Sequence, residues 1–167
     1  GLIYVCLGEP TTPIYDVSEV GQQGFESHVV GPVRWKAGAA RSLENFMDEA
    51  HLPWVHPGML GNVENVPLIP SREVEEKENG FYFEYRSECL DRVHRSKMTE
   101  NLLTYDVVLP YSLYHENVTP SGERVIDLFY CTPVSKHESL RFMVVARNFA
   151  LDTPAATFQN FTLAVWE

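Results

Sequence analysis

The second half of the chain is a succession of β-prone runs separated by turn signals, and this pattern restricts the possible folds most. The runs are rich in Val, Leu, Phe and Tyr, and they occupy residues 81–85, 102–109, 125–132 and 140–147. Turn residues fall between them, at Gly80, Pro120-Ser121-Gly122 and Ser135-Lys136-His137. Strands joined by such short turns pair in antiparallel order. With one helical segment upstream, the sequence predicts an α+β domain with one curved antiparallel sheet.

The helical segment lies before these strands. Ser42 is a suitable cap for a helix over residues 43–50, because a serine side chain at that position accepts a hydrogen bond from a backbone N–H of the first turn. Pro53 has no N–H for the helical ladder, so the pattern predicts a kink or a new start there. Pro57-Gly58 then ends the segment.

This segment carries four polar residues at spacings that indicate a chemical site. Asn45, Asp48 and His51 are three residues apart, which would place them on one face of a helix. A kink near Pro53 would turn the ring of His56 back toward His51. Two imidazoles beside carboxylates suit iron, zinc or nickel, and Asp48 is placed to accept the second ring N–H of a ligand histidine. The spacing alone is also compatible with two ordinary surface or core histidines, because a neutral imidazole is often simply buried and hydrogen-bonded.

Composition excludes several classes of function. The 167 residues suffice for one domain with a sizeable core, and the net charge of −10 opposes nucleic acid or an anionic membrane as the main partner. No apolar run is long enough to span a membrane. Three widely spaced cysteines without a C-x-x-C pair fit a reducing compartment, so the cytoplasm is the expected location. Three histidines in a basic patch or beside predicted turns are expected at the surface: His94, His115 and His137.

The pattern Asn-x2-Asp-x2-His-x4-His resembles the mononuclear-iron motif of Rieske-type non-haem iron oxygenase alpha subunits. Asn45-Phe46-Met47-Asp48, followed by Trp54-Val55-His56, is most similar to the branch that contains vanillate O-demethylase and dicamba demethylase. Residues 1–10 are similar to the last strand of a Rieske domain, and residues 147–152 resemble a late strand and turn of that branch. The resemblance therefore divides the chain into the end of a Rieske domain, residues 1–10, and a partial catalytic domain, residues 11–167.

The resemblance implies a role for each residue of the motif. His51 and His56 would ligate a mononuclear Fe(II), and Asn45 would lie close to the iron. Asp48 would hydrogen-bond to His51 and link it, across a subunit boundary, to the Rieske [2Fe-2S] cluster of a neighbour. The implied fold is a helix-grip fold of the START or Bet v 1 type, in which an antiparallel sheet wraps a C-terminal helix. The implied assembly is a head-to-tail homotrimer.

The sequence departs from the family in two respects. The Cys-x-His and Cys-x2-His pairs that hold a Rieske cluster do not occur in it. The third iron ligand, an Asp or Glu on the C-terminal helix, has no counterpart either, because residues 164–167 resemble the end of a strand. That ligand is expected beyond Glu167, and the nearest alternatives, Asp127 and Asp152, lie in no matching helix. The expectation is a sheet without its closing C-terminal helix, and an isolated fragment without activity.

The expected function is that of the catalytic domain of an O2- and NAD(P)H-dependent Fe(II) oxygenase. It would hydroxylate or demethylate a small aromatic or hydrophobic molecule, with monooxygenation favoured and a ferredoxin or reductase supplying electrons. Two alternatives stay open. A helix-grip module would bind a hydrophobic ligand without redox chemistry. A zinc hydrolase would use the same histidines, although the sequence contains no H-E-x-x-H motif.

Overall fold

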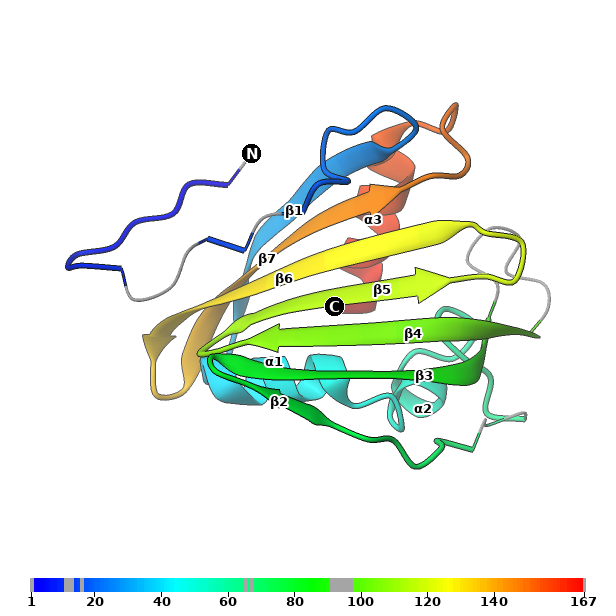
Figure 1. The fold of residues 1–167 in the computed structure, drawn as a ribbon, viewed down its shortest axis with the longest axis horizontal. Helices are drawn as coiled ribbons and strands as arrows, with labels where there is room; N and C mark the ends of the chain where they lie inside the picture. Colours follow the sequence, from blue (N-terminus) through cyan, green and yellow to red (C-terminus); the bar gives the residue numbers. More distant parts are fainter. Residues whose placement is uncertain are drawn as a thin grey trace.

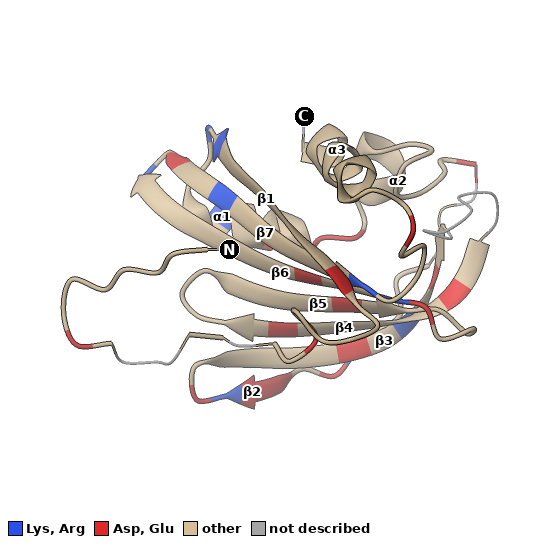
Figure 2. Cartoon of the chain, turned by 90° about the horizontal axis from the view of Figure 1, so that it is seen from above, with Lys and Arg blue, Asp and Glu red and all other residues tan. Residues whose placement is uncertain are grey.

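The computed structural model describes residues 2–10, 14–15, 17–64, 66, 68–90 and 98–166. These residues form a seven-stranded antiparallel sheet with α-helices on one side (Figures 1 and 2). Its strands are β1 (Glu26–Trp35), β2 (Glu75–Lys77), β3 (Gly80–Leu90), β4 (Met98–Val108), β5 (Ser112–Val118), β6 (Arg124–Ser135) and β7 (Glu138–Arg147). They are arranged in the order β1-β7-β6-β5-β4-β3-β2. The predicted α+β class with one antiparallel sheet is confirmed.

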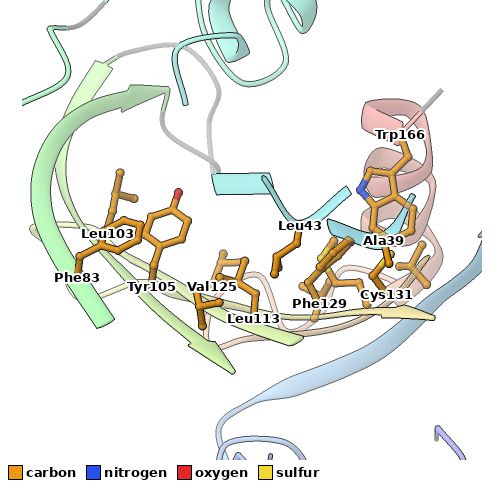
Figure 3. Close-up of a cluster of buried hydrophobic side chains, with 14 of the residues drawn as sticks. Ala39, Leu43, Phe83, Leu103, Tyr105, Leu113, Val125, Phe129, Cys131 and Trp166 are labelled. Carbon is orange, nitrogen blue, oxygen red and sulfur yellow. The ribbon is translucent and has the colours of Figure 1, made fainter. Parts of the chain in front are cut away.

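Alternation along the strands produces the buried inner face of the sheet, because successive side chains point to opposite faces. In β4, Leu103, Tyr105 and Val107 are buried, whereas the residues between them are partly exposed. Phe129 of β6 is fully buried on the same face. Figure 3 shows Leu103, Tyr105 and Phe129 pointing to the side of the sheet that the helices cover. Full burial of one such side chain contributes about 2 kcal/mol.

Three helices lie over this inner face in the described part of the chain: α1 (Ala39–Met47), α2 (Leu52–Val55) and α3 (Ala155–Trp166). α1 contacts β6 and β7, and α3 contacts β1. The prediction that the chain ends in a strand, with no later helix, is therefore wrong. The side chains of α3 that face the sheet recur at spacings of three and four residues: Phe158, Phe161, Thr162, Val165 and Trp166. This helical period outweighs the β-propensity of the last few residues.

The N-terminal residues lie on the outer side of the sheet, away from the helices (Figure 2). The ring of Tyr4 stands edge-on to Tyr130 of β6, with 5.3 Å between the centroids. Val17 and Ile126 belong to a second, smaller core on this outer side. Residues 2–10 take part in no strand, and their assignment to the end of a Rieske domain stays a prediction.

Several single predictions can be compared directly with the structure. His137 is exposed, as predicted, and His94 lies outside the described residues. The three cysteines are free, as their spacing indicated. In the described ranges, no helix has both the length and the apolar character needed to cross a membrane.

Candidate metal centre

The predicted metal-binding motif lies at a break between two helices. α1 ends at Met47, Asp48 adopts an extended conformation (φ −84°, ψ 101°), and α2 begins at Leu52. Asp48 favours the break, because its Oδ1 accepts a hydrogen bond from the N–H of Ala50 (3.0 Å) and so competes with the helical ladder. The single helix predicted over residues 43–50 is therefore wrong, and the break comes one turn earlier than the proline suggested.

One further detail of the predicted helix differs. Ser42 does not cap α1, because it lies fully buried inside the helix with its Oγ 3.0 Å from Oγ of Ser139. The new start predicted at Pro53 does occur: α2 begins at Leu52, and Pro53 occupies its second position, where a missing N–H removes no helical hydrogen bond. α2 is a single turn that ends at Val55, with His56 as its C-cap.

The break brings the two imidazole rings of the motif together. The ring centroids of His51 and His56 lie 5.6 Å apart, and the ring planes are inclined by 67°. Oδ2 of Asp48 lies 3.4 Å from Nδ1 of His51. The two atoms make no hydrogen bond, so the buried Nδ1 has no hydrogen-bond partner among the described residues. Asp48 therefore stands beside His51, as the predicted orienting role requires, without the hydrogen bond itself.

The protonation state of His56 and the spacing of the two rings suit a metal ion. Burial lowers the pKa of His56 below its usual value, and a positive charge on His51 lowers this pKa further. Neutral imidazole is the form that binds metal ions. A metal–nitrogen distance of about 2.1 Å limits the centroids of two rings on one ion to roughly 6.5 Å, and the observed 5.6 Å meets this limit. The pair fits one bound ion.

The histidines are not joined by a third ligand in the described part of the chain. No group of three His, Cys, Asp or Glu side chains among the described residues is arranged to hold an ion. Asp127 is buried in β6, where it lies opposite His115 in the register of the neighbouring strand β5. Asp152 lies exposed in the turn before α3. Neither aspartate completes the site, and a third ligand beyond Glu167 stays a prediction.

A cavity of about 320 Å³ opens beside the two rings. Asn45, Asp48, His51 and His56 all line this cavity, so the fold brings the four predicted residues to one place. The Oδ1 atom of Asn45 accepts a hydrogen bond from Nη2 of Arg141 (3.3 Å). Arg141 thereby belongs to the site, although the sequence analysis did not single it out.

The opposite wall of the cavity comes from the sheet. The prediction that His115 lies at the surface is wrong, because it is 5% exposed and its Nδ1 lies 3.1 Å from the carbonyl oxygen of Thr104. The ring centroids of His115 and Tyr105 lie 4.4 Å apart. The hydroxyl of Tyr105 donates a hydrogen bond to Oε1 of Glu49 (2.8 Å). Burial raises the pKa of Glu49 to about 7. Leu113 and His115 are two residues apart in β5, so their side chains point to the same face of the sheet. This two-residue period was the signal that could have predicted a buried His115.

A family model described as the vanillate O-demethylase oxygenase C-terminal domain matches residues 35–165. The chain belongs to this family. The matched range contains the whole motif from Asn45 to His56 and most of the sheet. The resemblance to the catalytic domain of Rieske-type oxygenases, and to the vanillate O-demethylase branch in particular, is confirmed.

Individual relatives agree with this assignment. Methylxanthine N1-demethylase NdmA of Pseudomonas putida is 29% identical over 92% of this chain and 44% of its own length. Flavonoid 8-hydroxylase 2, chloroplastic, of Ocimum basilicum is 32% identical over 65% of this chain and 22% of its own length. The chain therefore spans less than half the length of these relatives.

Solved structures share the fold. NdmA of Pseudomonas putida CBB5 with caffeine matches with a TM-score of 0.77 at 22% identity, over 92% of this chain and 44% of that one. Dicamba monooxygenase bound to 3,6-dichlorosalicylic acid matches with a TM-score of 0.67 at 11% identity, over 90% of this chain and 47% of that one. A START superfamily protein from Mycobacterium smegmatis matches with a TM-score of 0.55 at 11% identity, over 85% of this chain and 90% of that one. The predicted helix-grip fold is confirmed.

Proposed function

We propose that this chain is the mononuclear-iron domain of an O2-dependent oxygenase that hydroxylates or demethylates a small aromatic or hydrophobic molecule. The observation that carries the proposal is the convergence of His51 and His56, with ring centroids 5.6 Å apart, on one cavity in a member of this family. The relatives are named as demethylases of methylxanthines and a hydroxylase of flavonoids, which favours monooxygenation of a ring compound.

His51 and His56 would hold Fe(II), with a carboxylate from outside the described residues as the third ligand. Fe(II) with two imidazoles and one carboxylate keeps coordination positions open, so that O2 and substrate can meet side by side. The chain itself keeps the imidazole of His56 neutral by burial. The aromatic side chains of Trp35 and Trp166 line the same cavity and give it an apolar wall.

Electrons would come from NAD(P)H through a ferredoxin or reductase and a Rieske cluster in a neighbouring subunit of a homotrimer, in the cytoplasm. Asp48 would connect that cluster to His51. Two features support this role: Oδ2 of Asp48 lies 3.4 Å from Nδ1 of His51, and the Asp48 side chain is 50% exposed, as a contact with a neighbouring subunit would require. Asn45 would lie near the iron, held in place by its hydrogen bond to Arg141.

Iron binding by single-residue variants tests the ligand assignment. Fe(II) would be added without oxygen to the parent chain and to the variants His51→Ala, His56→Ala and His137→Ala, and bound iron would be measured in competition with a coloured chelator. The exposed His137 is the matched control, because it lies far from the motif in sequence and outside the cavity. We expect the parent and the control to bind iron, and the two site variants to lose it. Full iron binding by either site variant would refute the assignment.

The bridging role of Asp48 needs the longer protein that carries a Rieske cluster. There, Asp48→Asn keeps the size of the side chain but removes its charge. We expect unchanged iron content and loss of turnover, because electron transfer to the iron is interrupted while its ligands stay in place. Normal turnover by this variant would exclude the bridging role.

A hydrophobic-ligand-binding module without redox chemistry is the second candidate. The likeness to a START superfamily protein, with a TM-score of 0.55 over 85% of this chain, favours it. The two candidates differ in their dependence on metal. Binding of a hydrophobic probe that is unchanged by chelators, in a chain that takes up no Fe(II), would favour the binding module.

A further inference from the structure

Three cavities lie between the helices and the sheet. The first is the cavity of about 320 Å³ beside His51 and His56, here called the metal cavity. The second, the side cavity, has about 180 Å³ and lies between α2 and the strands β3 and β4. The third, the helix cavity, has about 100 Å³ and lies between α3 and the strands β6 and β7. Sites for small molecules usually have about 300 to 1,000 Å³, so only the metal cavity is large enough to hold a ligand by itself.

Leu60 stands where these three cavities meet. It is the one residue of the described chain that lines all three. A side chain that lines two cavities forms part of the wall between them. Leu60 therefore separates the metal cavity from both of its neighbours.

Backbone contacts hold Leu60 in this position. Its N–H donates a hydrogen bond to the carbonyl oxygen of His56 (3.1 Å), and the N–H of Gly58 donates to the carbonyl oxygen of Gly61 (2.7 Å). A Cβ at Gly61 would lie 2.9 Å from Cα of Pro53, so this turn packs directly against α2. Since the backbone at position 60 is fixed, the size of its side chain decides how far the metal cavity extends.

The wall toward the side cavity is the thinner of the two. Among the described side chains, only Leu52 and Leu60 line both the metal and the side cavity. Four residues line both the metal and the helix cavity: Phe46, Leu60, Val165 and Trp166. The side cavity is also the larger of the two neighbours, and its lining is mainly apolar. Shortening Leu60 would therefore open the metal cavity chiefly toward the side cavity.

We propose that Leu60 sets the length of the ligand that the metal cavity accepts. With leucine at position 60, the ligand ends at this side chain. With a smaller residue, an apolar extension of the ligand would continue into the side cavity. The proposal rests on the proposed function, because it takes the metal cavity as the substrate site, and it adds the residue that limits the size of the substrate.

A series of 4-alkylphenols from 4-methylphenol to 4-heptylphenol tests this limit, because its members share one ring and differ only in the length of an apolar chain. Calorimetric titration of the whole chain with each probe, in the presence of EDTA to exclude metal, measures the affinities. For the parent we expect the affinity to rise with the first CH2 groups and then to fall, because a longer chain is forced against Leu60. In Leu60→Ala the affinity should keep rising, by about fourfold per CH2 group, over about two further groups. Leu60→Phe should shift the preferred length in the opposite direction.

Val165→Ala is the matched control. It removes two methyl groups from the wall toward the helix cavity, where Phe46 and Trp166 still keep the two cavities apart, so the preferred chain length should stay that of the parent. Should Leu60→Ala not fold, as judged by circular dichroism, Leu60→Val replaces it, with a smaller shift in the same direction.

Three results would overturn the proposal. The first is a preferred chain length in the Leu60 variants that equals that of the parent. The second is an equal shift in Val165→Ala, which would make the effect one of loosened packing anywhere in the wall. The third is a parent chain that binds none of the probes, or binds them with affinity that rises over the whole series.

Fe(II) binding measured in parallel separates this proposal from the proposed function. Leu60→Ala should bind Fe(II) as the parent does, since leucine has no group that ligates a metal. A shift in preferred length in a chain that binds no iron would keep the size limit and refute the oxygenase function. Iron bound at His51 and His56 without such a shift would keep the oxygenase function and refute the role of Leu60.

Discussion

Replacing Arg141 by methionine tests whether its buried charge destabilises the fold. Burial lowers the pKa of Arg141 from 12.5 to about 9. At about 1.36 kcal/mol per pKa unit, holding the charged form in the fold costs about 5 kcal/mol. The exchange would lose two long hydrogen bonds, about 1 kcal/mol each, and the stacking on Trp35, about 1 to 2 kcal/mol. Because methionine is apolar and similar in length, the ligand-free chain should become more stable by roughly 1 to 2 kcal/mol.

Urea unfolding at pH 7, followed by far-ultraviolet circular dichroism, measures this difference in the free energy of unfolding. The control Arg34→Met changes a side chain that is 63% exposed and paired with Glu138, and it should shift stability by no more than about 0.5 kcal/mol. A loss of about 1 kcal/mol or more in Arg141→Met would refute the reasoning. In that case the guanidinium mainly ties α1 to the sheet through its bonds to Ser42 and Asn45.

Three further predictions use the same unfolding measurement. Burial, and then the charge of Arg147, lower the pKa of His28. Because the folded chain then binds this proton less readily than the unfolded chain, the free energy of unfolding should fall as the pH drops below about 6.5, and His28→Phe should flatten this dependence. An unchanged pH profile in His28→Phe would contradict the role of His28. Leu113→Ala removes a side chain that is 2% exposed and should destabilise by about 3 kcal/mol. Gly80→Ala would place a Cβ 1.7 Å from the carbonyl oxygen of Val107 and should destabilise by roughly 2 kcal/mol or more.

Much of the sheet could be predicted from sequence because strands such as β4 alternate cleanly, although β5 (Ser112–Val118) was not among the predicted runs. Leu103, Tyr105 and Val107 follow the two-residue period of a half-buried strand. The C-terminal helix was missed for a related reason: Ala164-Val165-Trp166 is β-prone when taken alone. The helical period becomes visible only when all of residues 155–166 are considered together. The sequence alone does not indicate which length of segment should be used to choose between strand and helix.

The motif residues of the site could be predicted, but their local geometry could not. The break before His51 depends on one hydrogen bond from Ala50 to the side chain of Asp48, and Asp48 occurs equally well in a helix or a turn. Arg141 was missed because a lone arginine in a strand usually faces solvent. Its inward position follows from the alternation of buried residues in β7, with Ser139 and Met143 on either side. Whether a buried arginine has a partner is a tertiary property that the sequence does not encode locally.

The distribution of polar residues on the inner face favours the oxygenase over a passive hydrophobic-binding module. His115, Asp127, Ser139 and Arg141 are all buried on strands that also bury apolar side chains such as Leu113, Phe129 and Met143. Buried polar groups reduce stability unless they are satisfied, and a pocket that only dissolves an apolar ligand has no use for them. His115 and Arg141 line the same cavity as the two histidines of the motif. Polar groups opposite His51 and His56 are suited to orienting a polar substrate, which is what the proposed oxygenase function would require.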